Sequence, residues 1–300
     1  MSKIRSINKK KHKDWICAYL LIAPVFLGLI VFYIYPFFQS FYNSFLEVGR
    51  FGKSSWGGMI NYKTLFQDKE FIKSLMNTLY YIILTVPVGI CLSLILAALL
   101  NSKIRGKSFY RVIYFLPSVT MSTATALVWK WIYNGDFGML NGILNIFGIT
   151  GKSWLTDNAT ALIAVAVVGI WMSFGYNMII LLAGMQGISR SYYEAASIDG
   201  AGGIRQFYKI TVPLVTPTIF FVMITSLISG FQVFDIVYMM IGKSSTAYNA
   251  TQTIVRMYYM NAFDYANKGY ASAIAMVIFV VIMIITVIQM RLQKKWVNYE

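Results

Sequence analysis

The stretch SLMNTLYYIILTVPVGICLSLILAALL, residues 74–100, contains no Asp, Glu, Lys or Arg and decides the class of fold. A helix needs about 20 mostly apolar residues to cross a bilayer, and this run is longer than that. Five further apolar runs lack the same four residue types, near residues 15–38, 112–129, 158–182, 210–234 and 269–290. The pattern predicts an all-α, polytopic membrane protein with six transmembrane helices.

The composition supports the same conclusion. Hydrophobic residues make up 58% of the chain, charged residues 12%, and the mean hydropathy is +0.61. A soluble domain has roughly 45–50% apolar and roughly 25% charged residues, so a soluble globule is excluded. A disordered chain is excluded for the same reason. Cys17 and Cys91 lie inside apolar runs, where a free cysteine behaves as a small hydrophobic residue, so the sequence predicts no disulfide framework.

The net charge of +15 does not indicate nucleic acid binding, because Lys and Arg gather in short polar segments between the apolar runs. These residues are about twice as dense in 1–14, 101–111, 184–213 and 291–300 as in the segments that alternate with them. The positive-inside rule then places both termini in the cytoplasm. We expect a multi-pass membrane protein that contacts lipid and has no nucleic acid partner.

Residue types for catalysis or metal binding are sparse. His12 is the single histidine, and no Cys/His cluster has the spacing of a zinc site. The segment Gly148–Ser153 has two residues between its glycines where a phosphate-binding loop has four. The glycines at 200–203 follow no predicted strand, so they do not form a dinucleotide fingerprint. The sequence predicts no catalytic residue, no metal ligand and no cofactor in this chain.

The polar segment 184–213 is long for a loop between two spans, and loops of this length usually carry a function. Ser191 followed by Glu194 predicts a capping box at the start of a short helix, which the glycines at 200–203 end. A second short amphipathic segment, Ile204–Val212, follows. Two short helices at a glycine corner, with exposed aromatic and aliphatic side chains, predict a docking element for another protein.

One pattern in this loop resembles a known family. Glu194-Ala195-Ala196-Ser-Ile-Asp199-Gly200, then nine residues and Ile210-Thr-Val212-Pro213, resemble the EAA signature of permease subunits of binding-protein-dependent ABC importers. Val212 departs from it, since the family usually has leucine there. Other blocks resemble the carbohydrate-uptake branch, of the maltose or glycerol-3-phosphate type: Tyr19–Pro24, Phe115–Pro117, Phe231–Asp235 with Tyr238, and Ala262-Phe263 with Gly269–Ala273.

The resemblance implies a permease subunit that is not an enzyme, working by alternating access in the cytoplasmic membrane of a bacterium. ATP and Mg²⁺ would be bound by two cytosolic ATPase subunits, and a second homologous permease would complete a heterodimer. An extracytoplasmic solute-binding protein would deliver the substrate. The residues implied in ATPase coupling are Tyr193, Glu194, Ala195, Ala196, Asp199, Gly200, Ala201, Phe207 and Pro213.

We also expect three regions along the chain. Residues 1–72 would contain the cytoplasmic N-terminus, the first transmembrane helix and an external loop. Residues 73–292 would form the importer core with five helices and the coupling loop at 184–213, and residues 293–300 a cytoplasmic tail.

Polar residues in the fifth apolar run suggest a route through the membrane. Thr225, Ser229, Gln232 and Asp235 follow spacings of four, three and three, which places them on one face of a helix. Such a stripe is costly in hydrocarbon unless it faces other helices or water, so interhelical hydrogen bonding and pathway lining both remain open. The expected substrate-pathway residues are Trp171, Phe174, Tyr176, Asn177, Ser229, Gln232 and Asp235, with core packing as the alternative for the aromatic residues.

The main functional expectation is an importer permease that translocates a carbohydrate, an oligosaccharide or a related sugar. The same machine for glycerol phosphate derivatives or aminated sugars is the alternative within transport. An ion-coupled secondary carrier would need acidic residues inside the membrane, and only Asp235 approaches that. A membrane-embedded enzyme is disfavoured because no catalytic cluster is visible.

Overall fold

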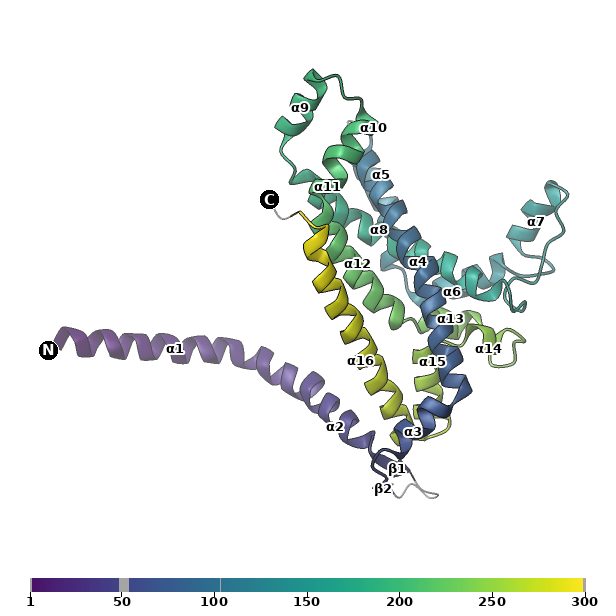
Figure 1. The fold of residues 1–300 in the computed structure, drawn as a ribbon, viewed down its shortest axis with the longest axis horizontal. Coiled ribbons are helices and arrows are strands. Elements are labelled where there is room, and N and C mark those ends of the chain that lie inside the picture. Colours follow the sequence, from purple (N-terminus) through teal and green to yellow (C-terminus); the bar gives the residue numbers. More distant parts are fainter. Residues whose placement is uncertain (1, 49–53, 103, 299–300) are drawn as a thin grey trace. The chain divides into compact units, whose positions relative to one another are not determined.

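The computed structural model describes residues 2–48, 54–102 and 104–298 (Figure 1). These residues are almost entirely helical and fall into two compact units. The first unit extends to Leu65 and includes Asn261–Met276, and the second comprises Phe66–Met260 with the chain from Val277 onward. We describe each unit by itself.

The first unit contains one long apolar helix and a small hairpin. The helix α1 (Ser2–Leu29) continues through a π-helical turn (Ile30–Ile34) into α2 (Tyr35–Asn43). Two strands, β1 (Leu46–Val48) and β2 (Ser54–Trp56), pair antiparallel, and α3 (Ile60–Gln67) follows them. Asn61 Nδ2 donates to the carbonyl oxygens of Ser44 at 2.9 Å and Leu46 at 2.8 Å, so its amide ties α3 to the start of the hairpin.

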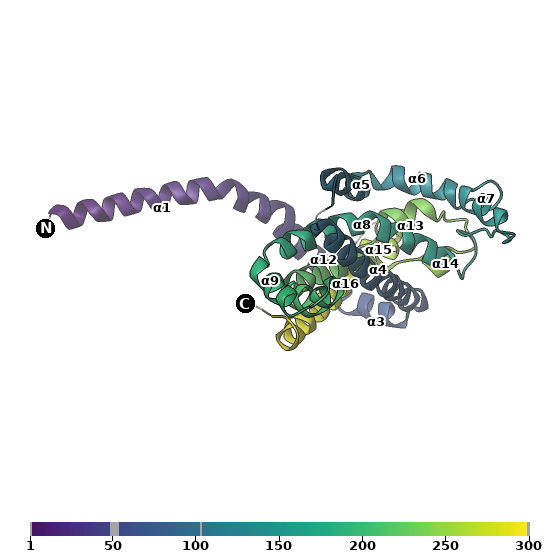
Figure 2. The ribbon, with the colours of Figure 1, turned by 90° about the horizontal axis from the view of Figure 1, so that it is seen from above.

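The second unit is built around α4 (Lys69–Asn101) and α8 (Ala161–Gln186), which pack against each other. Seen from above, α5, α6 and α7 lie along one edge of this unit (Figure 2). The other elements up to residue 260 are α5 (Lys107–Val119), α6 (Ser122–Ile132), α7 (Met139–Ile146), α9 (Arg190–Ile198), α10 (Gly203–Gln206), the π-helical turn Phe207–Thr211, α11 (Val212–Leu214), α12 (Thr216–Phe231), α13 (Asp235–Met240), α14 (Tyr248–Thr251) and α15 (Ile254–Tyr259). The chain ends with the π-helical turn Met260–Asp264, α16 (Lys268–Leu292) and the 3-10 turn Gln293–Lys295. Within this last part, Asn261–Met276 belong to the first unit and the residues from Val277 onward to the second.

Two buried apolar clusters hold the second unit together. One surrounds Val165 and Val168 of α8 and Phe231 of α12, and the other surrounds Met178 and Leu181 of α8. Both clusters include residues of α4, α8 and α12, and the first also includes residues of α6 and α13. The packing of these three helices positions the cavity described below.

Four helical segments of the described chain are long and apolar enough to cross a membrane: Asp14–Asn43, Lys69–Asn101, Ala161–Gln186 and Lys268–Lys295. Two further helix pairs pass the same test together but are bent, by 97° between α5 and α6 and by 67° between the Gly203–Leu214 segment and α12. Counting each bent pair as one crossing gives six spans. The predicted polytopic helical fold is confirmed, with the short hairpin as its exception.

The third and fifth of the six predicted spans are present as bent helix pairs, not as single straight helices. In the third run, the hydroxyl of Thr120 donates to the carbonyl oxygen of Pro117 at 2.7 Å, and α5 ends at Val119. In the fifth run, α12 begins only at Thr216, after a break at Val215. Proline has no backbone N–H to donate, so Pro117 and Pro217 weaken the helical ladder near these breaks.

Candidate functional site

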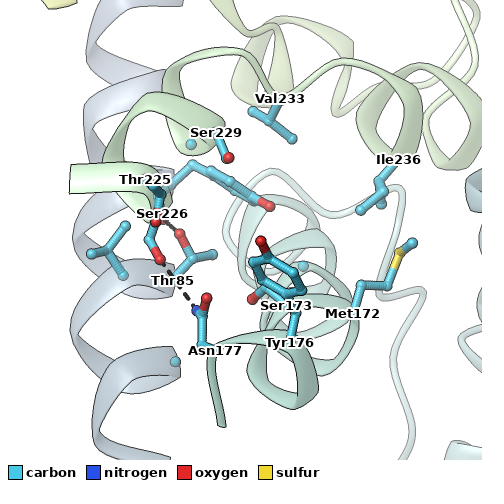
Figure 3. A pocket seen from close by; sticks show the side chains of 15 residues that line it. Thr85, Met172, Ser173, Tyr176, Asn177, Thr225, Ser226, Ser229, Val233 and Ile236 are labelled. Carbon is cyan, nitrogen blue, oxygen red and sulfur yellow. Dashed lines mark hydrogen bonds between the residues drawn. The ribbon is translucent and has the colours of Figure 1, made fainter. Parts of the chain in front are cut away.

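A cavity of about 270 Å³ lies between α4, α8 and α12 of the second unit. Figure 3 shows Ser229 on the α12 side and Ser173, Tyr176 and Asn177 on the α8 side. Hydroxyl, phenol and amide groups alternate with apolar surface around it. The lining residues are Tyr81, Thr85, Val86, Gly89, Gly169, Met172, Ser173, Tyr176, Asn177, Thr225, Ser226, Ser229, Gly230, Val233 and Ile236.

Some of the polar groups are already engaged with the protein and others are free. Asn177 Nδ2 donates to Ser226 Oγ at 3.2 Å, which links α8 to α12, and Thr85 Oγ1 donates to the Tyr81 carbonyl oxygen at 2.9 Å. Within the described part of the chain, the Tyr81 phenol has no hydrogen-bond partner. It lies against α8 at Gly169, where a Cβ would overlap its oxygen. The phenol is therefore available to a bound solute.

The cavity wall is electrically neutral. None of its fifteen lining residues is Asp, Glu, Lys, Arg or His. Hydroxyl groups and an amide can both donate and accept hydrogen bonds. The flat aromatic rings can pack against an apolar face of a solute. This chemistry suits a polyhydroxylated solute, which presents hydroxyls at its edge and C–H groups on its faces.

The structure brings three of the seven predicted pathway residues to this cavity: Tyr176, Asn177 and Ser229. Phe174 is buried beside the Tyr114 ring, with centroids 6.1 Å apart, and Trp171 packs edge-on against Trp129 at 5.6 Å. Neither of these two rings lines the cavity.

The expectation that one helix face carries Thr225, Ser229, Gln232 and Asp235 is wrong, because α12 ends at Phe231. Gln232 and Asp235 are exposed, in and just after the break that precedes α13, and they do not line the cavity. A signal in the sequence could have identified the α4 side instead. Ser74, Thr78, Tyr81 and Thr85 follow spacings of four, three and four within the apolar run 74–100, and the last two line the cavity.

The 184–213 loop forms the second candidate site, and its first helix starts earlier than predicted. Ser189, not Ser191, caps α9, since its hydroxyl accepts from the Ser191 N–H. Because α9 begins at Arg190, the third helical position of a capping box is Tyr192, and Glu194 lies two residues beyond it. The break predicted at the glycines is present, and Gly200 has a φ of +73°, a conformation that favours glycine.

Internal hydrogen bonds brace the corner of this loop. Gln206 Nε2 donates to Ser197 Oγ and to the Ala201 carbonyl oxygen, both at 2.9 Å, so it links α10 to the end of α9. The hydroxyls of Tyr193 and Thr211 lie 2.9 Å apart and link α9 to the turn before α11. Gln206 and Thr211 were not among the predicted residues. The loop therefore behaves as one preformed unit, not as a flexible linker.

The exposed surface of the loop is mixed in character. Glu194, Ala195, Asp199 and Gly200 are exposed, and the side chains of Ile198 and Ile204 are 88% and 79% exposed. Two large aliphatic side chains on a braced corner form a protruding apolar surface next to two carboxylates. The remaining predicted coupling residues, Tyr193, Ala196, Ala201, Phe207 and Pro213, are half-buried. The protruding surface around Ile198 and Ile204 has the character of a docking surface for a groove in another protein.

In the described ranges, no group of three or more His, Cys, Asp or Glu residues could hold a metal ion. Arg256 of α15 is fully buried and donates from Nη2 to the Ile241 carbonyl oxygen at 2.7 Å, with its guanidinium 4.3 Å from the Tyr248 ring centroid. Burial lowers the pKa of Arg256, and the nearby Tyr248 and Tyr238 oppose that shift.

Comparison with known sequences gives a match over most of the chain. The family described as "Binding-protein-dependent transport system inner membrane component" matches residues 69–298. The probable ABC transporter permease protein YesP of Bacillus subtilis (strain 168) is 35% identical, over 100% of this chain and 96% of that protein. The sn-glycerol-3-phosphate transport system permease protein UgpA of Agrobacterium fabrum is 33% identical, over 95% of this chain and 97% of that protein.

Solved structures share the fold. A chain of a bacterial ABC transporter involved in the import of the acidic polysaccharide alginate superposes with a TM-score of 0.87 at 23% identity, over 98% of this chain and 100% of that chain. The alginate transporter in complex with a periplasmic protein bound to an alginate pentasaccharide gives a TM-score of 0.84 at 22% identity, over 96% of both chains. At these identities the likeness concerns the fold alone.

Proposed function

This chain belongs to the family of binding-protein-dependent transport system inner membrane components, and from that premise we propose that it carries a carbohydrate across the cytoplasmic membrane. The observation that supports this most is the cavity between α4, α8 and α12. Its neutral hydroxyls, phenols and amide match an uncharged sugar, and the cavity lies within helices that the permease fold would move during alternating access.

A glycerol phosphate derivative is the second candidate, favoured by the similarity to the permease named for sn-glycerol 3-phosphate. A phosphate ester would bring a double negative charge to a wall without cations, and an uncompensated charge is costly to desolvate. The cavity chemistry therefore favours the sugar, and the uptake assay below distinguishes the two.

The 184–213 loop supports the proposed partners. The braced corner at Gly200, with exposed Ile198 and Ile204 beside Glu194 and Asp199, would fit a groove in a cytosolic ATPase subunit. Two such ATPases would bind ATP and Mg²⁺, a second homologous permease would complete the heterodimer, and an extracytoplasmic binding protein would load the substrate. The same arrangement requires both termini and the 184–213 loop to face the cytoplasm, in agreement with the distribution of Lys and Arg.

The direct test of this assembly is affinity purification of the tagged chain from detergent-solubilised membranes. We expect an ATPase and a second permease to copurify, and the reconstituted complex with its binding protein to take up a neutral oligosaccharide in an ATP-dependent manner. Uptake of sn-glycerol 3-phosphate but of no saccharide would replace the proposed substrate. A chain that transports solute without any ATPase would refute the importer.

A matched pair of tyrosines tests the cavity. The Tyr81 phenol lines the cavity, whereas the neighbouring Tyr80 is 46% exposed and lies outside it. We expect Tyr81→Phe to lower substrate uptake by roughly threefold to tenfold, the effect of one lost hydrogen bond, and Tyr80→Phe to leave uptake unchanged. Because the Tyr81 hydroxyl has no partner among the described residues, its removal should not disturb ATPase copurification. Equal uptake by both variants would place the substrate elsewhere.

A further inference from the structure

The junction between the 184–213 loop and α12 has a defect in its hydrogen bonding. In a regular helix, the carbonyl oxygen of residue 213 accepts from the N–H of residue 217. Residue 217 is proline, which has no N–H, and the chain bends by 67° at this place. The Pro213 carbonyl therefore accepts from other groups, and two of these donors are local to the bend: the backbone N–H of Val215 and the hydroxyl of Thr216.

A segment near the C-terminal end of the chain adds a further donor, from outside the bend. Asn298 Nδ2 donates to the Pro213 carbonyl oxygen at 3.2 Å, and the hydroxyl of Thr216 donates to the same oxygen at 2.7 Å. The backbone N–H of Asn298 in turn donates to Thr216 Oγ1 at 3.0 Å. Asn298 thus contacts the Pro213 carbonyl both directly and through Thr216.

Apolar packing holds the same end in place. The Trp296 ring meets the Phe220 ring of α12 edge-on, with centroids 6.0 Å apart, and Val297 is only 9% exposed. Thr216 and Phe220 are themselves buried. Residues 296–298, which we name the C-terminal clamp, therefore bind the first turns of α12 through both hydrogen bonds and buried surface.

The position of the clamp matters for force transmission. The 184–213 loop leads directly into the bend, and α12 carries Thr225, Ser226 and Ser229 in the wall of the cavity. A bend with unsatisfied backbone groups is soft, so a displacement of the loop would be absorbed there. A bend fixed by a second chain segment transmits the displacement to the helix beyond it.

We propose that the C-terminal clamp makes the bend before α12 rigid, so that movement of the 184–213 loop reaches the cavity. Asn298 and Trp296 are positioning residues in this scheme, since neither touches the cavity. The proposal rests on the proposed function, in which ATPase subunits move the loop.

The test measures the amount of solute transported for each ATP hydrolysed, using the complete importer in proteoliposomes. We expect Asn298→Ala to lower this ratio by roughly fivefold, since one hydrogen bond to a semi-buried carbonyl is lost, while the ATPase still copurifies and hydrolyses ATP. Trp296→Ala should act in the same direction. Lys295→Ala, an exposed change in the same tail, is the matched control and should keep the ratio of the unmodified protein.

A rescue separates positioning from a general loss of folding. Pro217→Ala gives position 217 the N–H that the Pro213 carbonyl lacks, so adding it to Asn298→Ala should restore a large part of the ratio. An unchanged ratio in both single clamp variants would overturn the proposal. Loss of assembly in Asn298→Ala that Pro217→Ala does not repair would also overturn it, because the tail would then serve folding alone. If no ATPase copurifies with the unmodified chain, the proposed function itself fails.

Discussion

Asn141 shows how one buried amide organises a loop. Its side chain is 3% exposed, and Nδ2 donates to the carbonyl oxygens of Gly135 at 2.8 Å and Lys152 at 3.0 Å. Its Oδ1 accepts from Trp154 Nε1 at 2.7 Å. The side chain therefore joins the two halves of the segment between α6 and α8. Nothing in the sequence distinguished this asparagine from its neighbours, since the partners of its amide are backbone carbonyls distant along the chain.

Replacing Asn141 with leucine keeps the branched shape of the side chain but removes all of these bonds. The carbonyl oxygens of Gly135 and Lys152 and the Trp154 N–H would then lack a hydrogen-bond partner. Since each unpaired buried group costs about 1–3 kcal/mol, the local stability of the loop should fall by about 2–4 kcal/mol. Hydrogen exchange of residues 134–156 should then accelerate by more than about tenfold. Asn145→Leu, an exposed change on the same helix, should leave exchange unaltered. Equal exchange in both variants would show that the loop is held by other contacts.

At the scale of elements, the contact between α5 and α8 depends on the absence of a side chain. A Cβ at Gly175 would overlap the carbonyl oxygen of Tyr114 and approach Cα of Phe115. Both obstacles are backbone atoms, which cannot swing aside. We expect Gly175→Ala to separate the two helices and to lower the thermal stability of the purified protein. Gly142→Ala, with no atom within 4 Å of the added Cβ, should be harmless. Equal stability of the two variants would show that α5 does not rest on α8.

The existence of most elements could be predicted from apolar runs, but their breaks could not. Periodicity and length identify a span because hydrocarbon excludes charged residues over a fixed thickness. The prolines at 117, 213 and 217 were visible, yet proline alone does not set a bend. The hydrogen bonds beside the bends of 97° and 67°, from Thr120 to Pro117 and from Asn298 to Pro213, form only in the folded chain.

At the scale of the molecule, the family could be identified from one short pattern. The resemblance of the Glu194–Gly200 segment is confirmed by the family match over residues 69–298. The pathway was harder, because a cavity is assembled from α4, α8 and α12, and only two of these helices drew attention from their polar residues. The run that forms α4 was interpreted only as a membrane-spanning helix, although Tyr81 and Thr85 lie on one face of it and line the cavity.

Orientation across the membrane is testable on the whole chain. In a background with Cys17 and Cys91 changed to Ala, we expect Lys152→Cys to react with an impermeant maleimide in intact spheroplasts. Ile198→Cys, in the 184–213 loop, should react only after permeabilisation, because the basic loops stay in the cytoplasm. Both positions are exposed in the structure, so differences in labelling report the side of the membrane. The reverse pattern would invert the proposed topology.

The neutral wall of the cavity also has an electrical consequence. A membrane voltage of 100 mV does about 2.3 kcal/mol of work on each elementary charge that crosses the bilayer. A wall of hydroxyls, amide and phenols, with no Asp, Glu, Lys, Arg or His among its lining residues, has no charge for that field to displace. When an uncharged sugar passes this wall, its movement draws no energy from voltage or proton gradient. Movement past this wall is therefore electrically silent. The direction of transport must come from another energy source, which in the proposed importer is ATP hydrolysis by the partner subunits.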